Sequence, residues 1–119
     1  MKTLSVNKIS SVVLIVMMAL AALPVRAAYA AGTITSTATG GAWNVPGSWV
    51  GGVIPNPLVD SVVIATTGGD TVTLVAAIPV KGSLTINGGA ELDTNGVALT
   101  LEGDFINNGI FDTTGATVG

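Results

Sequence analysis

The sequence, 119 residues long, contains no cysteine and no histidine. These two absences exclude a disulfide framework, Ser-His-Asp and Cys-His catalysis, and the usual zinc and copper sites. Aromatic residues are scarce as well, at 4% of the chain, and four basic residues stand against seven acidic ones. Any catalytic or binding site must therefore be built from carboxylates, hydroxyls, amides and a few aromatic rings.

Residues 1–30 have the three parts of a secretory signal peptide. Lys2 and Lys8 supply positive charge, residues 9–23 form an apolar core, and an Ala-Tyr-Ala stretch ending at Ala30 provides the small residues of a cleavage site. A spanning helix needs roughly 20 apolar residues, whereas this core has 15 and is followed by a proline. We therefore expect the leader to be cleaved and the mature chain to be secreted or displayed on the cell surface.

Cleavage after Ala30 changes the charge balance. Lys81 is then the one remaining base, all seven acids remain, and the net charge becomes −6. The acids are Asp60, Asp70, Glu91, Asp93, Glu102, Asp104 and Asp112. So acidic a chain has no electrostatic footprint for nucleic acid or an anionic membrane, and no later stretch is apolar enough to span a bilayer. A small domain without disulfides needs stacking against further sequence, self-association or bound metal for stability.

The mature chain has the composition of strands and turns, rich in Gly, Thr, Val, Asn and Leu, with no segment of helical periodicity. In residues 71–75, Val72 and Leu74 share one face and threonines the other, which is typical of strands buried on one side. The predicted strands are 62–65, 71–75, 83–86, 90–94, 98–101 and 110–113. The asparagines expected at the corners between them, or in stacked ladders, are Asn87, Asn95, Asn107 and Asn108.

A loose repeat runs through the last forty residues. The segment GGAELDT aligns with NNGIFDT at an offset of 19, which pairs Leu92 with Phe111 and Asp93 with Asp112. The tripeptides LTI and LTL recur at a different spacing, of 15. Periods near 20 with an Asn-Gly corner are typical of a β-solenoid, although a β-sandwich of hairpins would show the same turns. The pattern therefore predicts an all-β fold, either the first coils of a parallel β-helix or a β-sandwich.

The segment 31–60 differs from the coils expected over residues 61–119. It carries Trp43 and Trp49 and three of the four prolines of the mature chain. It is too rich in Gly and Pro for a regular strand and is expected to form a compact irregular loop. Because an open first coil would expose unpaired backbone groups, we expect this loop to cap the coils.

At this point the residue order resembles a known group of proteins. The shared residues are Gly41, Trp43, Asn44, Ser48, Trp49, Gly51, Gly52, Pro55, Asp60, Val62 and Ile64. Followed by TVTL, SLTINGGAEL and LTLEGDFINNGIF, they resemble the N-terminal module of large bacterial secreted and surface β-helix proteins, of adhesin or autotransporter-passenger type. A glycine-rich domain of some cell-surface proteins is a looser match. The resemblance implies a cap and the first coils of a right-handed parallel β-helix that continues beyond residue 119.

Carboxylates are the remaining candidates for chemistry. Glu91 and Asp93 lie two residues apart, as do Glu102 and Asp104, and paired carboxylates serve glycoside hydrolysis. The favoured alternative is a solvated outer face, since no Arg, Tyr or His completes a site in the mature chain. Asp93 and Asp112 would stack one coil apart, where they either form part of a Ca²⁺ site with turn carbonyls or repel one another on a surface ladder.

Trp43 and Trp49 allow two interpretations. An exposed indole would stack on a sugar ring and make the pair a glycan-binding site. Alternatively, both indoles pack over the first coil as the lid of the hydrophobic core, which we favour because the chain has so few other large side chains. Asp60 is expected to accept hydrogen bonds from local backbone N–H groups in a turn.

The sequence thus predicts an exported structural or adhesive surface protein with no catalytic site and no required cofactor. Its expected partners are cell-surface or matrix glycans or proteins, and further copies of itself. Two alternatives stay open. The chain is the non-catalytic head of a β-helix polysaccharide-degrading enzyme, or it is a small glycan-binding module that uses its tryptophans.

Overall fold

The structure, a computed structural model, describes residues 31–116 and 118–119, so the predicted signal peptide lies outside the described residues. Within this part there are ten short strands and two 3-10 helices. The strands are β1 (Thr33–Thr35), β2 (Gly41–Ala42), β3 (Ser61–Ile64), β4 (Thr71–Thr73), β5 (Ile78–Val80), β6 (Leu84–Ile86), β7 (Glu91–Asp93), β8 (Leu99–Leu101), β9 (Phe105–Asn107) and β10 (Ile110–Asp112). The helices are η1 (Pro46–Ser48) and η2 (Val50–Gly52). No helix in the described part is long and apolar enough to cross a membrane.

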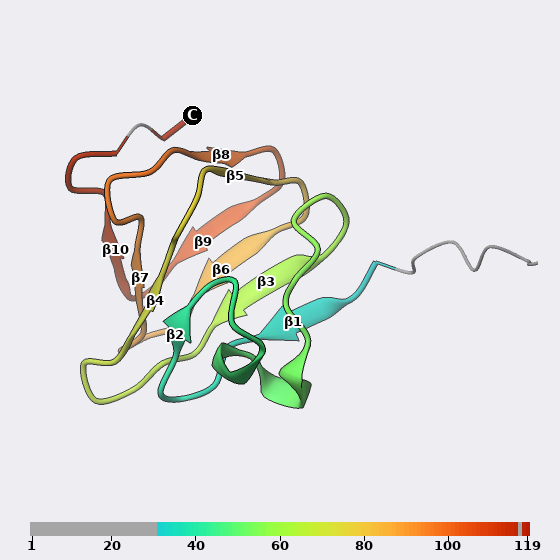
Figure 1. The fold of residues 1–119 in the computed structure, drawn as a ribbon. Coiled ribbons are helices and arrows are strands. Elements are labelled where there is room, and N and C mark those ends of the chain that lie inside the picture. Colours follow the sequence, from blue (N-terminus) through green and yellow to red (C-terminus); the bar gives the residue numbers. More distant parts are fainter. Residues whose placement is uncertain (1–30, 117) are drawn as a thin grey trace, which may run out of the picture.

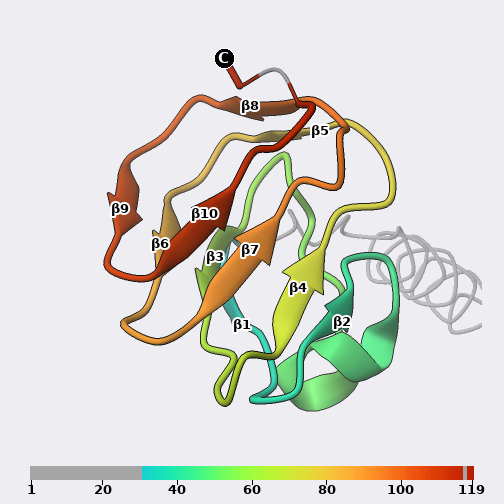
Figure 2. The ribbon, with the colours of Figure 1, turned by 90° about the vertical axis from the view of Figure 1, so that its left-hand side faces the viewer.

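The strands form three sheets, and every pairing between named strands is parallel. The first sheet has the order β1-β3-β6-β9, the second β2-β4-β7-β10, and the third β5-β8. Consecutive strands therefore lie on different sheets, and each passage of the chain around the molecule adds one strand to the first and the second sheet, as Figures 1 and 2 show. The third sheet gains a strand only in the two passages that contain β5 and β8. We call one such passage a rung. The predicted all-β fold is confirmed, whereas a sandwich of antiparallel hairpins does not fit these pairings.

The interior is lined by columns of apolar side chains, because alternate residues of a strand point to opposite faces. Val62 pairs with Leu84 in the first sheet, Val72 pairs with Leu92 in the second, and all four side chains are fully buried. Full burial of such a side chain contributes about 1.5–3 kcal/mol. The inward positions predicted for Val72 and Leu74 are confirmed.

The structure distinguishes the two repeat spacings. The register between β7 and β10 places Leu92 beside Phe111 and Asp93 beside Asp112, the pairs given by the offset of 19. The spacing of 15 has no structural counterpart, because LTI forms β6 in the first sheet and LTL forms β8 in the third. The local similarity of the two tripeptides reflects the shared in-out alternation of strands rather than equivalent places.

The sequence did not predict four of the strands, namely β1, β2, β5 and β9. Segment 31–60 was expected to form an irregular loop, but β1 and β2 within it pair with β3 and β4 and extend the first two sheets. They were missed because β1 has three residues and β2 has two, one of them glycine. β5 contains a proline, which is compatible with a strand at the edge of a sheet. In β9 all three residues are exposed, so it has no buried alternation to recognise.

At one corner of the stack, two of the three equivalent positions have no room for a side chain. This corner lies just before the first-sheet strands, where Asp60, Gly82 and Gly103 occupy equivalent places in successive rungs. A Cβ atom added at Gly82 would overlap the carbonyl oxygen of Asp60, and one added at Gly103 would overlap the carbonyl oxygen of Gly82. Glycine is therefore required here by the close approach of one rung to the next.

Candidate functional site

Trp43 and Trp49 close one end of the apolar interior. Their rings meet edge to face, with centroids 4.9 Å apart and planes at 74°. Trp49 Nε1 donates a hydrogen bond to the Trp43 carbonyl oxygen at 2.8 Å. The two residues are only 4% and 1% exposed. Neither indole presents a face to a sugar ring in this structure, so the geometry favours the lid over the glycan-binding interpretation.

Hydroxyl groups fix the segment that carries these indoles. Ser48 Oγ donates to the Ala42 carbonyl at 2.7 Å, and the Thr37 backbone N–H donates to the Ser48 carbonyl at 2.9 Å. Ser36 forms an isolated antiparallel bridge with Trp49, and its Oγ accepts a hydrogen bond from the Ala65 N–H at 2.8 Å. Both serines are 2% exposed. The sequence offered little to identify them, because a buried serine and a surface serine look alike among Thr, Gly and Ala.

Asp60 is a buried carboxylate that joins two parts of the same end. Its Oδ2 accepts a hydrogen bond from the Asn56 N–H at 2.8 Å, and its Oδ1 accepts one from the Gly32 N–H at 3.1 Å. The residue is 1% exposed. The predicted turn contact is confirmed at Asn56, and the bond to Gly32 adds a long-range link that the sequence did not indicate. We call residues 31–60 the capped end; β2 and the two 3-10 helices of this end lie to the right in Figure 2.

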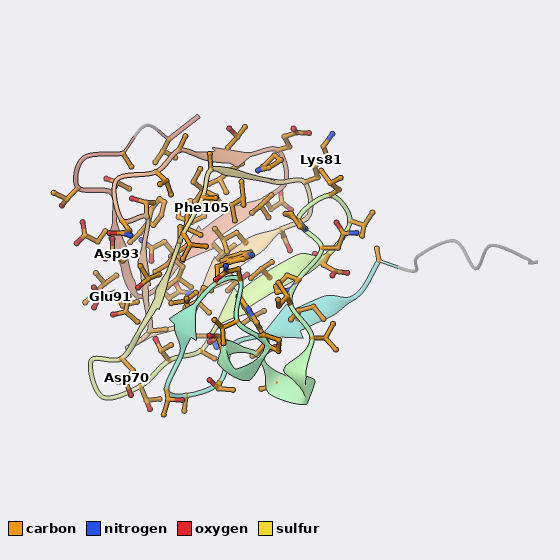
Figure 3. The ribbon with its side chains drawn as sticks, in the orientation of Figure 1. Asp70, Lys81, Glu91, Asp93 and Phe105 are labelled. Carbon is orange, nitrogen blue, oxygen red and sulfur yellow. The ribbon has the colours of Figure 1, made fainter. Side chains whose placement is uncertain are left out.

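The two carboxylate pairs have different surroundings. Glu91 and Asp93 share the outer face of β7, and Figure 3 shows them on the same side of the molecule as Asp70. Glu102 forms an ion pair with Lys81 at 3.5 Å, with both side chains about half exposed. In the described residues no group of three or more Asp or Glu side chains is close enough to hold a metal ion. The arrangement is that of a solvated outer surface.

Asp93 and Asp112 are neighbours in register, as predicted, but each carboxylate serves its own turn. Asp93 Oδ1 accepts the Asn95 N–H at 2.7 Å. Asp112 Oδ1 accepts the Thr114 hydroxyl at 2.6 Å and the Thr114 N–H at 2.9 Å. The hydroxyl and then the backbone bond hold the pKa of Asp112 below its ordinary value, because both stabilise the ionised form. These contacts support turn formation by both aspartates.

The corner asparagines act as turn formers. Asn95 adopts a left-handed conformation with φ 52°, which asparagine tolerates better than most residues. Its Nδ2 donates to the Leu74 carbonyl at 3.3 Å in the preceding rung. Asn107 Oδ1 accepts the Gly109 N–H at 3.0 Å. All four corner asparagines are exposed, so they do not build a ladder inside the stack.

The opposite end of the stack is apolar and uncovered. β9 and β10 are the last strands of their sheets, at the left in Figure 2. Phe105 is 40% exposed, Ile106 49% and Ile110 57%. The Phe105 and Phe111 rings lie 5.2 Å apart. We call β9, β10 and Val118 the open end; it is a candidate interaction surface that sequence reasoning did not assign to particular residues.

Comparisons with known proteins identify no relative. No protein family, no curated protein and no solved structure matches the chain. The function must therefore be argued from the fold and its surfaces alone.

Proposed function

We propose that the chain forms the capped start of a right-handed parallel β-helix and serves as an exported, surface-displayed structural or adhesive protein without a catalytic role. The observation that carries this proposal is the stack of three parallel sheets around a largely apolar interior. Such a stack presents long, flat outer faces and is a common way to build an extended binding surface. The signal-like leader supports an exported role.

The outer face of the second sheet is the surface that we propose for adhesion. Thr71, Glu91 and Ile110 form one outward column and Thr73, Asp93 and Asp112 the next. Asp70 adds a further carboxylate beside this face. A row of acids without a base in these columns would select partners that carry positive charge, such as basic segments of matrix proteins.

The proposal is tested by the retention of beads coated with the exported protein on surfaces bearing basic or neutral ligands. The double variant Asp70→Asn, Glu91→Gln should lose retention on basic surfaces, and added salt should weaken the wild type in the same way. Glu102→Gln is the matched control, because Glu102 lies away from this face and is paired with Lys81. Equal retention of all three proteins, or none on any surface, would contradict the adhesive role.

A further inference from the structure

The capped end carries exposed aliphatic side chains on its outside. We call residues 45–58, which comprise η1, η2 and the segment that leads to β3, the apolar loop. Five of its large aliphatic side chains are between 36% and 61% exposed, namely Val45, Val50, Val53, Ile54 and Leu58. Exposed apolar groups gathered in this way mark a contact with another protein or with a membrane.

The apolar loop protrudes from the stack on a fixed support. A Cβ atom added at Gly47, Gly51 or Gly52 would meet no heavy atom of the surrounding structure within 4 Å. Figure 2 shows η1 and η2 at the lower right, outside β2. Between the exposed positions, the buried Ser48 and Trp49 bind the loop to the rest of the capped end. The aliphatic groups are therefore held outward.

The distribution of charge sets this surface apart from the rest of the chain. Residues 31–59 contain no Asp, Glu, Lys or Arg, whereas residues 60–119 contain all seven acids and Lys81. The Lys81 backbone N–H donates to the Pro57 carbonyl at 2.8 Å, and its side chain is paired with Glu102. Moving a charged group from water into an apolar phase costs far more than burial of an aliphatic group gains. A surface without charges is what contact with lipid requires.

The chemistry of the exposed side chains favours lipid over a protein partner. Energetically important positions of protein–protein interfaces are rich in Trp, Tyr and Arg and poor in Leu and Val. In the apolar loop the exposed large side chains are Val, Ile and Leu, and Trp49 is buried. The loop thus offers aliphatic area without the anchor residues that such interfaces use.

The apolar loop is also tied to the point where the predicted leader joins the stack. Asp60 accepts hydrogen bonds from the N–H groups of Gly32 and Asn56, and Figure 1 shows the start of β1 and the segment that leads to β3 on the same side. Seven residues, 24–30, separate the apolar core of the leader from Ala31. They span at most about 25 Å. A leader inserted in a membrane therefore keeps the loop close to the lipid surface.

We propose that the apolar loop docks on a neutral lipid surface, with Val50, Val53 and Ile54 entering the boundary between head groups and acyl chains. This inference rests on the exported role proposed above. Peripheral binding depends on the apolar area buried and on attraction to anionic lipid. The net charge of −6 over residues 31–119 removes the second contribution. The contact is therefore apolar, selects zwitterionic over anionic lipid, and shares no residue with the acidic columns of the second sheet.

The first test is flotation of the protein, purified after export, with phosphatidylcholine vesicles. The wild type should float with these vesicles, added salt should leave binding unchanged, and phosphatidylglycerol vesicles should bind less protein. Val50→Asp should weaken binding about tenfold, because a carboxylate would have to leave water. Ile110→Asp is the matched control. Ile110 is 57% exposed but lies on β10, at the opposite edge of the second sheet from β2, so this variant should bind as the wild type does.

The absence of cysteine allows the contact to be located directly. Val53→Cys, labelled with a polarity-sensitive fluorophore, should shift its emission to the blue when phosphatidylcholine vesicles are added. Ile110→Cys with the same label should show no shift. Both positions are at least half exposed, so neither label displaces a buried side chain.

Three results would overturn the proposal. The first is a wild type that floats with neither kind of vesicle. The second is a loss of binding in Ile110→Asp as large as that in Val50→Asp. The third is a wild-type dimer without lipid that Val50→Asp converts to a monomer, which would assign the apolar loop to a second copy of the chain.

The lipid contact and the adhesive role are scored separately. Vesicle binding without retention of coated beads would contradict the adhesive role alone. Retention of beads without vesicle binding would contradict the lipid contact alone.

Discussion

The capped end and the open end bound the described part of the same interior in different ways. At the capped end two indoles fill the interior, and buried hydroxyls and a carboxylate bind the backbone around them. At the open end a phenylalanine and two isoleucines are substantially exposed on the last strands of their sheets. The difference shows that the first rung is closed by more than its strands. Closure requires an irregular segment with large side chains and its own polar contacts.

The largest expected effect is a loss of stability when one aromatic side chain is truncated at each end. The size of the loss should differ between the two ends. Trp49→Ala removes a ring that is 1% exposed and a hydrogen bond to Trp43. We expect a loss of about 3–5 kcal/mol in the free energy of unfolding, measured by urea denaturation. Phe105→Ala, at a position 40% exposed, should cost about 1 kcal/mol. Equal losses would show that the two ends are equally well packed and would break the comparison.

A smaller effect is expected at the corner formed by Asp60, Gly82 and Gly103. The same steric clash can be created there in two successive rungs. Gly82→Ala places a Cβ atom on the Asp60 carbonyl, and Gly103→Ala places one on the Gly82 carbonyl. The strand after Gly82 is paired on both sides, whereas the strand after Gly103 is paired on one side. Gly82→Ala should therefore cost about 1–3 kcal/mol by thermal or urea unfolding, and Gly103→Ala clearly less because its rung can shift. A larger loss at Gly103 would contradict an adaptable open end.

The smallest effect concerns the titration of Asp112 at the open end. Its pKa is depressed by the Thr114 hydroxyl, so the group stabilises the fold above the ordinary Asp pKa and loses this contribution as the pH falls through the lowered value. Thr114→Val should raise the pKa of Asp112 towards the ordinary value, as followed by NMR titration of the carboxyl carbon. Asp112 would be independent of the turn if its pKa were the same in both proteins.

The sequence predicted the regular part of the molecule better than either end. Val72, Leu74, Leu84 and Ile86 could be placed inside because a period of two reports directly on burial. The offset that pairs Leu92 with Phe111 could be found because the rungs after the first have nearly the same length, with partner residues 19–22 positions apart. β1 and β2 could not be predicted, since strands of two or three residues carry no periodicity and exist through their pairing with β3 and β4.

The candidate sites show the same limit. The lid formed by Trp43 and Trp49 was among the interpretations, but the sequence could not distinguish a buried indole from an exposed one. The proximity of Asp60 to Gly32 depends on how segment 31–60 folds back, which no local pattern encodes. The exposed edge at Phe105 depends on which strands have neighbours. That property belongs to the assembled sheet rather than to any residue in it.

The parallel stack itself is tested most directly by NMR distance restraints between side chains of different rungs in the exported protein. We predict nuclear Overhauser contacts along the columns Val62–Leu84–Phe105 and Val72–Leu92–Phe111, with parallel strand register in both. Cross-strand contacts between consecutive strands, such as β6 with β7 in an antiparallel hairpin, would contradict the stacked architecture and with it the distinction between a capped end and an open end.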